Sequence, residues 1–416
     1  MNPIIILNKI GIYGLYCLLV MVPHHFYFST ITAFVYYREF MAVFFLALLF
    51  MHLAYERFID YKIRKEIFYL LLFPVLLCVA AIYDPLINLY QESYGLETMT
   101  SSVSMQIDPR VYILRNAILY LPLVLYFSNR GVSNQELKDL ASISVLVAPF
   151  SIVFYLLSVY EQGNFSLFLL GEMAEQGGAN IQYNSYVPYL TFPFISAIYL
   201  LSLRDSKVLK VLSLASISIM AVFIFLSSSR QSMLLIILAS FLFALYDGSG
   251  KLKKLFFYSS SAFLILLTFY YLTSDYELDE GLINKYQSGA ETSRILILVN
   301  GFKLLKLHEF LTGAGLSSVL VSGPHNDYLR WTQRVGFVLM VISFLPYFIG
   351  IFRCGLRVLK EKIKIHYIYL SLLLFFLLYH SIFGYPREDA YQSLFSFLGL
   401  ALWLGYQKSE DLTLKT

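Results

Sequence analysis

The chain has 416 residues, of which 58% are hydrophobic and only 14% are charged. Soluble globular domains carry about a quarter charged residues, so this composition, with a mean hydropathy of +0.66, excludes an ordinary soluble protein. The formal net charge of +4 is spread over short connections and gives no sign of nucleic-acid binding. The cysteines (Cys17, Cys78 and Cys354) lack metal-ligand spacing and indicate neither a disulfide framework nor a zinc site.

The apolar residues gather in runs long enough to cross the roughly 30 Å of a bilayer's hydrocarbon, which predicts an all-α polytopic membrane protein with about twelve spans. The first run lacks a basic start and a small-residue cleavage site, so we expect a retained helix. No separate soluble domain is visible, and 1–416 is predicted to form one integral membrane domain. The predicted limits are 4–22, 34–54, 67–84, 111–127, 140–159, 186–203, 208–226, 232–247, 256–273, 335–352, 367–384 and 391–406.

Lysine and arginine concentrate in alternate connections, as in Arg57–Lys65, Arg204–Lys210 and Arg353–Lys364. By the positive-inside rule these connections face the cytoplasm, and both termini then lie there too. Three long segments face outward: 85–110, 160–185 and 274–334. The last is the longest polar stretch of the chain, so we expect any chemistry to take place under it.

The outward segment 274–334 contains three distinct features. An apolar stretch at 294–305 is too short to span and predicts an interfacial or re-entrant helix. A glycine turn follows at 311–315, with the sequence Leu-Thr-Gly-Ala-Gly. Near the end stands the polar sequence Gly-Pro-His-Asn-Asp-Tyr-Leu at 323–329, just before the next apolar run.

His325 is the first candidate for chemistry. A neutral imidazole at the membrane surface can accept a proton from a hydroxyl near pH 7, although a structural role is the usual one for a lone histidine. Gly323 and Pro324 predict a turn before it. Asn326 and Asp327 supply polar neighbours that orient the ring, and Tyr328 completes the set of supporting residues.

Two arginines are candidates for binding a phosphate group. Arg230 lies in a very short outward turn, framed by serines and without a carboxylate nearby, which suits an anion site; the alternative is a side chain that reaches the lipid headgroups. Arg294 follows Thr292 and Ser293, a candidate N-cap, so a helix start and a guanidinium together can bind phosphate oxygens. Its alternative is a solvated loop charge.

Weaker candidates complete the outward face. Arg38 stands next to Glu39 and forms either a site or a local ion pair, while Arg115 either reaches the interface or faces the bundle. Arg387 and Glu388 form the last outward turn, and Arg330 and Arg334 are expected to meet lipid phosphates. No P-loop, nucleophile elbow, HExxH motif or paired acids are present, so no metal and no cofactor are expected.

The order of these features resembles the O-antigen ligase/polymerase family of bacterial envelope glycosyltransferases, whose members share a large periplasmic loop with an HN-x-x-L motif. The resemblance covers residues 226–345 and rests on Ser-Arg at the start of a span, an arginine at the head of the long loop, Gly-Ala-Gly, and His-Asn-Asp-Tyr-Leu before the next span. Many relatives have an acid shortly after the motif, where this chain has Gln333 and Arg334, so no role of that acid carries over.

The resemblance implies a GT-C-type membrane glycosyltransferase in the bacterial inner membrane, with its active site in the periplasm. Its donor and acceptor are glycans on undecaprenyl pyrophosphate, and a chain-length regulator protein is a further expected partner. Arg230 and Arg294 match the arginines that bind the pyrophosphate, and His325 matches the base that activates the acceptor hydroxyl. The expected reaction is metal-independent and inverting.

Three functions remain open. An O-antigen polymerase joins lipid-linked repeat units and is favoured by the divergent motif and by the composition, which is rich in Phe, Tyr and Ile. An O-antigen ligase instead transfers the glycan to lipid A-core. A transporter of lipid-linked sugars is the third, but such proteins show two similar halves or ionisable residues at the membrane midplane, and neither is visible here.

Overall fold

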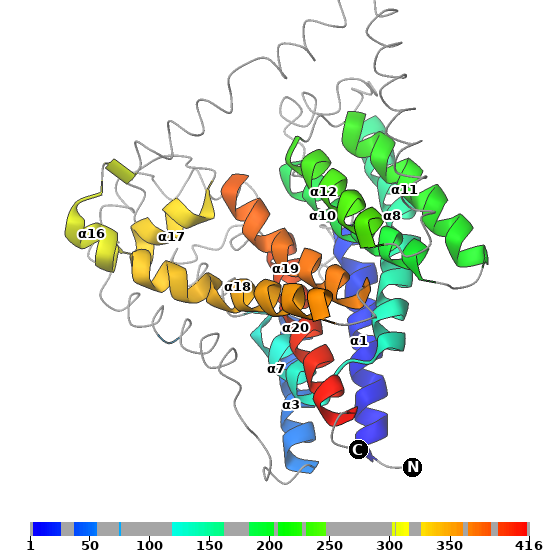
Figure 1. Ribbon diagram of the computed structural model, residues 1–416, viewed down its shortest axis with the longest axis horizontal. Helices are drawn as coiled ribbons and strands as arrows, with labels where there is room; N and C mark the ends of the chain where they lie inside the picture. The colour runs from blue at the N-terminus through cyan, green and yellow to red at the C-terminus, as the bar shows by residue number, and fades with distance from the viewer. Residues whose placement is uncertain are drawn as a thin grey trace, which may run out of the picture.

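The protein is helical throughout the part of the chain that the computed structural model describes (Figure 1). That part comprises residues 3–25, 37–55, 75, 119–161, 183–203, 207–226, 230–246, 302–303, 305–315, 326–360, 365–383 and 390–413. Its helices are α1 (Pro3–His25), α3 (Tyr37–Tyr55), α7 (Leu121–Arg130), α8 (Asn134–Glu161), α10 (Tyr183–Ser202), α11 (Lys207–Leu226), α12 (Arg230–Tyr246), α16 (Leu307–Thr312), α17 (Asp327–Val335), α18 (Phe337–Lys360), α19 (Ile365–Phe383) and α20 (Ala390–Thr413).

The prediction of a helical membrane protein is confirmed. Four described helices, α8, α11, α18 and α19, are long and apolar enough to cross a membrane, and α1, α3, α10 and α12 contain shorter apolar stretches. On α11 the side chains of Val208, Val211, Ile219 and Val222 are exposed, as expected of a helix with one face on lipid. The predicted spans 67–84 and 256–273 lie outside the described residues, apart from the single helical residue Val75, and 111–127 is described only from residue 119.

Several helix limits differ from the sequence prediction. The span expected to begin at residue 335 begins at Phe337, because Gly336 has a positive φ of 86° and separates it from a preceding helix. That preceding helix is α17, which occupies the end of the segment expected to be a loop. In addition, α18 and α20 continue past their predicted ends to Lys360 and Thr413.

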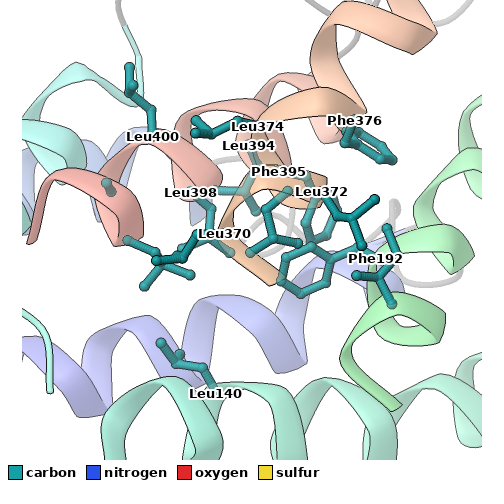
Figure 2. Close-up of a cluster of buried hydrophobic side chains, with 14 of the residues drawn as sticks. Leu140, Phe192, Leu370, Leu372, Leu374, Phe376, Leu394, Phe395, Leu398 and Leu400 are labelled. Carbon is teal, nitrogen blue, oxygen red and sulfur yellow. The ribbon is translucent and has the colours of Figure 1, made fainter. Parts of the chain in front are cut away.

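Helix α19 lies at the centre of the bundle and contacts α10, α12, α17, α18 and α20. Of the four helices long enough to cross a membrane it is the most buried, since 72% of its apolar stretch, Ile365–Ile382, lies inside the protein. Figure 2 shows its side chains packed with those of α20 and α10 in an apolar core, and Leu140 of α8 belongs to the same cluster of buried residues. A helix that is apolar all round is expected at such a central position. The residues labelled in the core are Leu140, Phe192, Leu370, Leu372, Leu374, Phe376, Leu394, Phe395, Leu398 and Leu400.

Polar contacts join several helix termini at one end of the bundle. The Val132 amide donates to the Gly405 carbonyl at 3.0 Å, which ties the α7–α8 connection to α20. Tyr199 Oη and His366 Nδ1 share a hydrogen bond of 2.7 Å between the end of α10 and the start of α19. Tyr367 donates to Glu410, so the start of α19 also meets the end of α20. The connections after α7, α10 and α18, which were expected to face the same side, therefore follow helix ends that lie together.

Candidate functional site

The best-described part of the predicted site is the start of α17, where Asn326 is the N-cap. Its Oδ1 accepts a hydrogen bond from the Leu329 amide at 2.9 Å, as N-cap side chains do. Its Nδ2 donates to the Ile382 carbonyl at 2.9 Å, and Ile382 is in the last turn of α19, where carbonyls have no partner within the helix. The Asn326 side-chain amide thus pairs one backbone amide at the start of α17 and one backbone carbonyl at the end of α19.

The next two residues of the motif also bind α19. Tyr328 Oη donates to the Leu378 carbonyl at 2.8 Å, and the Tyr328 ring packs on Phe344 of α18 with centroids 4.6 Å apart. Asp327 is fully buried, and its Oδ2 accepts a hydrogen bond of 3.4 Å from Ser381. An acid in the first turn of a helix is also stabilised by the helix dipole. The first turn of α17 is therefore fixed on the last turn of α19.

The glycine turn binds the other end of α17. The Ala314 amide donates to the Gln333 carbonyl at 2.6 Å, and the Gly315 amide donates to the Arg334 carbonyl at 3.2 Å. These are carbonyls of the last turn of α17, which need partners outside the helix. Gly313 has a φ of 84°, and a Cβ there would overlap the Arg334 carbonyl oxygen. The turn and the His-Asn motif, predicted as separate features, thus meet on one short helix.

Most of the remaining surface of α17 is also covered. Leu329, Trp331 and Thr332 are buried. Gln333 and Arg334, which stand where relatives of the resembled family have an acid, are buried at 1% and 5% exposure. The expectation that Arg334 meets lipid phosphates is therefore wrong, because its side chain has almost no open surface. Arg330 is partly exposed.

His380 was not singled out from the sequence. It stands on the turn of α19 that binds the motif, is 1% exposed, and packs on Phe376 with ring centroids 4.4 Å apart. Neither imidazole nitrogen has a hydrogen-bond partner among the described residues. A histidine inside an apolar run carries no sequence signal for this arrangement, because burial depends on which helices surround it.

The other predicted site residues are described only in part. Arg230 is the first residue of α12, which packs on α10 and α19, and Arg38 is in the first turn of α3; the side chains of both lie outside the described residues. Ser232, two residues after Arg230, is fully buried. The remaining candidates lie wholly outside the described part of the chain: Arg115, Arg294, His325, Arg387 and Glu388.

Within the described residues, no group of three or more His, Cys, Asp or Glu side chains is placed to bind a metal ion. No model of a known protein family matches the chain, and no curated protein sequence matches it.

Proposed function

We propose that the protein is an O-antigen polymerase that joins oligosaccharide repeat units carried on undecaprenyl pyrophosphate. The observation that supports this best is the assembly of α17. The glycine turn and the His-Asn motif are the two most specific parts of the resemblance, and hydrogen bonds to Asn326, Gln333 and Arg334 join them on one short helix. If the two stretches resembled the family only by chance, they would not be expected to meet on the same helix.

In the proposed reaction His325 accepts the proton of the acceptor hydroxyl while the new glycosidic bond forms. The bond from the donor sugar to pyrophosphate breaks, and the leaving pyrophosphate takes the electron pair. Arg230 and Arg294 stabilise the charge that develops there. Attack from the side opposite the leaving group inverts the anomeric carbon, and the arginines replace a metal ion as the electrophile.

His325 is bonded directly to Asn326, which hydrogen bonds tie to the end of α19. In the proposed topology two helix ends face outward: the start of α12, which carries Arg230, and the end of α19. The two helices pack on each other.

The proposed topology has about twelve spans of GT-C type in the bacterial inner membrane, with both termini in the cytoplasm and 274–334 in the periplasm. The shared end of the bundle supports it, because the α7–α8 connection, the end of α10, the start of α19 and the C-terminal part of α20 are joined there. Lys408 of α20 also donates to the Asn129 carbonyl. The α17–α19 contacts join the end of α19 that is opposite to this cluster.

An O-antigen ligase is the second candidate, because the resemblance covers ligases and polymerases alike and they differ in the acceptor. The Asn326 cap and the glycine turn fit both enzymes equally, so only the product separates them. A flippase of lipid-linked sugars is the third candidate and would require no base at residue 325.

The deciding experiment uses a strain that lacks this gene, with its lipopolysaccharide run on a gel. Lipid A-core carrying a single repeat unit is the expected result, because ligation then still works without polymerisation. Bare core with long glycan on undecaprenyl pyrophosphate would instead indicate a ligase. Bare core with no periplasmic glycan would indicate a transporter.

The residue roles are tested by complementing that strain with variants. His325→Ala is expected to restore no polymer, whereas His308→Ala, an exposed histidine in the same segment, restores all of it. Arg230→Lys is expected to fail as well, because an ammonium lacks the planar fork of a guanidinium. If His325→Ala restored polymer to the wild-type level, His325 would not be the base. Inhibition of purified enzyme by a chelator, reversed by a divalent ion, would overturn the metal-independent mechanism.

A further inference from the structure

An exposed apolar stripe runs along α18 from its first residue. Phe337, Val341, Phe348 and Phe352 are all exposed large hydrophobic side chains, and Leu359 continues the stripe at the other end. The opposite side of α18 is buried on α19. Since α18 is apolar and long enough to cross a membrane, this stripe is the face that the helix turns to lipid.

Helix α16 adds to this apolar surface at the start of α18. Its Phe310 ring stacks on Phe337 with centroids 5.0 Å apart and planes inclined by 16°. Leu307 and Leu311, four residues apart and so on the same side of α16, are 76% and 46% exposed. The Leu311 carbonyl lies against Gly336, the residue before Phe337. The exposed leucines therefore stand beside the point where the span begins.

Polar groups suited to lipid headgroups surround these leucines. Lys303, Lys306 and His308 are exposed. The nearby acid, Glu309, is used within the helix, where its carboxylate accepts a hydrogen bond of 2.8 Å from the Lys306 amide. A short helix with exposed leucines and flanking lysines has the composition of a segment that lies in the membrane interface, with apolar side chains among acyl chains and cations at the phosphates.

We propose that α16 is an interfacial anchor: it lies in the outer leaflet of the bilayer, where phospholipids cover Leu307 and Leu311. The bilayer is the occupant because this face continues the lipid-facing stripe of a membrane span. The glycine turn joins the anchor to the last turn of α17, through the amides of Ala314 and Gly315. The depth of α16 in the bilayer therefore sets the height of α17 above the membrane. If the proposed function holds, this height places the motif at the level of the pyrophosphate of a lipid-linked substrate.

The test is spin-label accessibility in full-length protein. Cys17 and Cys78 are replaced by serine, the buried Cys354 is retained, and a nitroxide is attached to a cysteine at position 307, 311 or 308. The protein is reconstituted in vesicles of phosphatidylethanolamine and phosphatidylglycerol, and collisions with oxygen and with a water-soluble nickel chelate are measured. The ratio of oxygen to nickel collisions is expected to be several-fold higher at 307 and 311 than at 308.

Two results would overturn the anchor. Frequent nickel collisions at 307 and 311 would place α16 in water, and few collisions with either reagent would show that protein covers it. A double variant, L307D with L311D, gives a second measurement if labelling disturbs the fold. It is expected to increase hydrogen exchange in α17 several-fold, whereas L307M with L311M leaves exchange unchanged.

These readouts need no enzymatic activity, so the two proposals can fail separately. Lipid-exposed labels together with full polymer in the His325→Ala strain would retain the anchor and remove the polymerase mechanism. Water-exposed labels together with loss of polymer in that strain would remove the anchor and retain the polymerase mechanism.

Discussion

Replacing Asn326 by alanine tests whether the motif helix depends on this one amide. The change removes the acceptor of the Leu329 amide and the donor to the Ile382 carbonyl. Loss of an N-cap costs about 1 kcal/mol, and loss of the hydrogen bond to the partly buried Ile382 carbonyl costs about 1–2 kcal/mol more. Since such terms are not fully additive, we expect the closed position of α17 to lose about 2–3 kcal/mol relative to the open one.

Hydrogen exchange measures this loss directly, because amides of a locally opening segment exchange in proportion to its open population. A loss of about 2–3 kcal/mol raises the exchange rate of peptides covering 327–335 roughly 30- to 140-fold, at about 1.4 kcal/mol for each factor of ten. Peptides from α8, which is far from the motif in the sequence, serve as the internal control and are expected to exchange as in the wild type.

A matched substitution separates the two hydrogen bonds. Asn326→Ser retains an N-cap of similar strength but has no amide to reach Ile382, so its exchange rate should lie between those of wild type and Asn326→Ala. Unchanged exchange of α17 in Asn326→Ala would refute the reasoning. Equal exchange in the serine and alanine variants would show that the cap itself contributes nothing.

Two further predictions concern stability in detergent. Gly313→Ala and Gly336→Ala should each lower the thermal midpoint, because both positions have positive φ and an added Cβ would overlap a carbonyl oxygen. Gly355→Ala is the control, since its Cβ meets nothing within 4 Å, and should raise the midpoint, because alanine is favoured over glycine in helices by about 1 kcal/mol; a midpoint unchanged by the first two would contradict the close approach. His380→Leu should also raise the midpoint, because it removes two buried nitrogens without partners among the described residues, and a lower midpoint would mean that the ring has a partner.

Most of the described helices could be predicted from the sequence, because apolar runs of sufficient length leave few alternatives in a bilayer. The limits of α10, α11 and α12 differ from the predicted spans by only a few residues. Helix α17 was missed because it is short and polar. Its limits were nevertheless visible as Asn326 before it and Gly336 after it, the residue types that begin and end helices. Capping signals therefore deserve weight in the polar loops of membrane proteins.

The contacts of the site could not be predicted in the same way. The acceptor of the Asn326 amide, the Ile382 carbonyl, belongs to another helix, and every backbone residue offers the same carbonyl group. The partners of the Gln333 and Arg334 carbonyls likewise belong to another segment, since they are the amides of the glycine turn. Sequence patterns show which residues form an element. They do not show which backbone carbonyl a polar side chain will meet.

The structure changes how the His-Asn motif is interpreted. Asn326 uses both halves of its amide, Tyr328 donates to α19, and Leu329 is fully buried. These three residues therefore position α17, and a substitution at any of them is expected to move the helix. In the proposed reaction the chemical roles belong to His325, Arg230 and Arg294, whose side chains lie outside the described residues. The variants can be told apart by experiment. If the proposed function holds, a variant of His325 should lose polymer formation while hydrogen exchange in α17 stays as in the wild type. A variant of Asn326 should lose polymer formation and also exchange faster in α17.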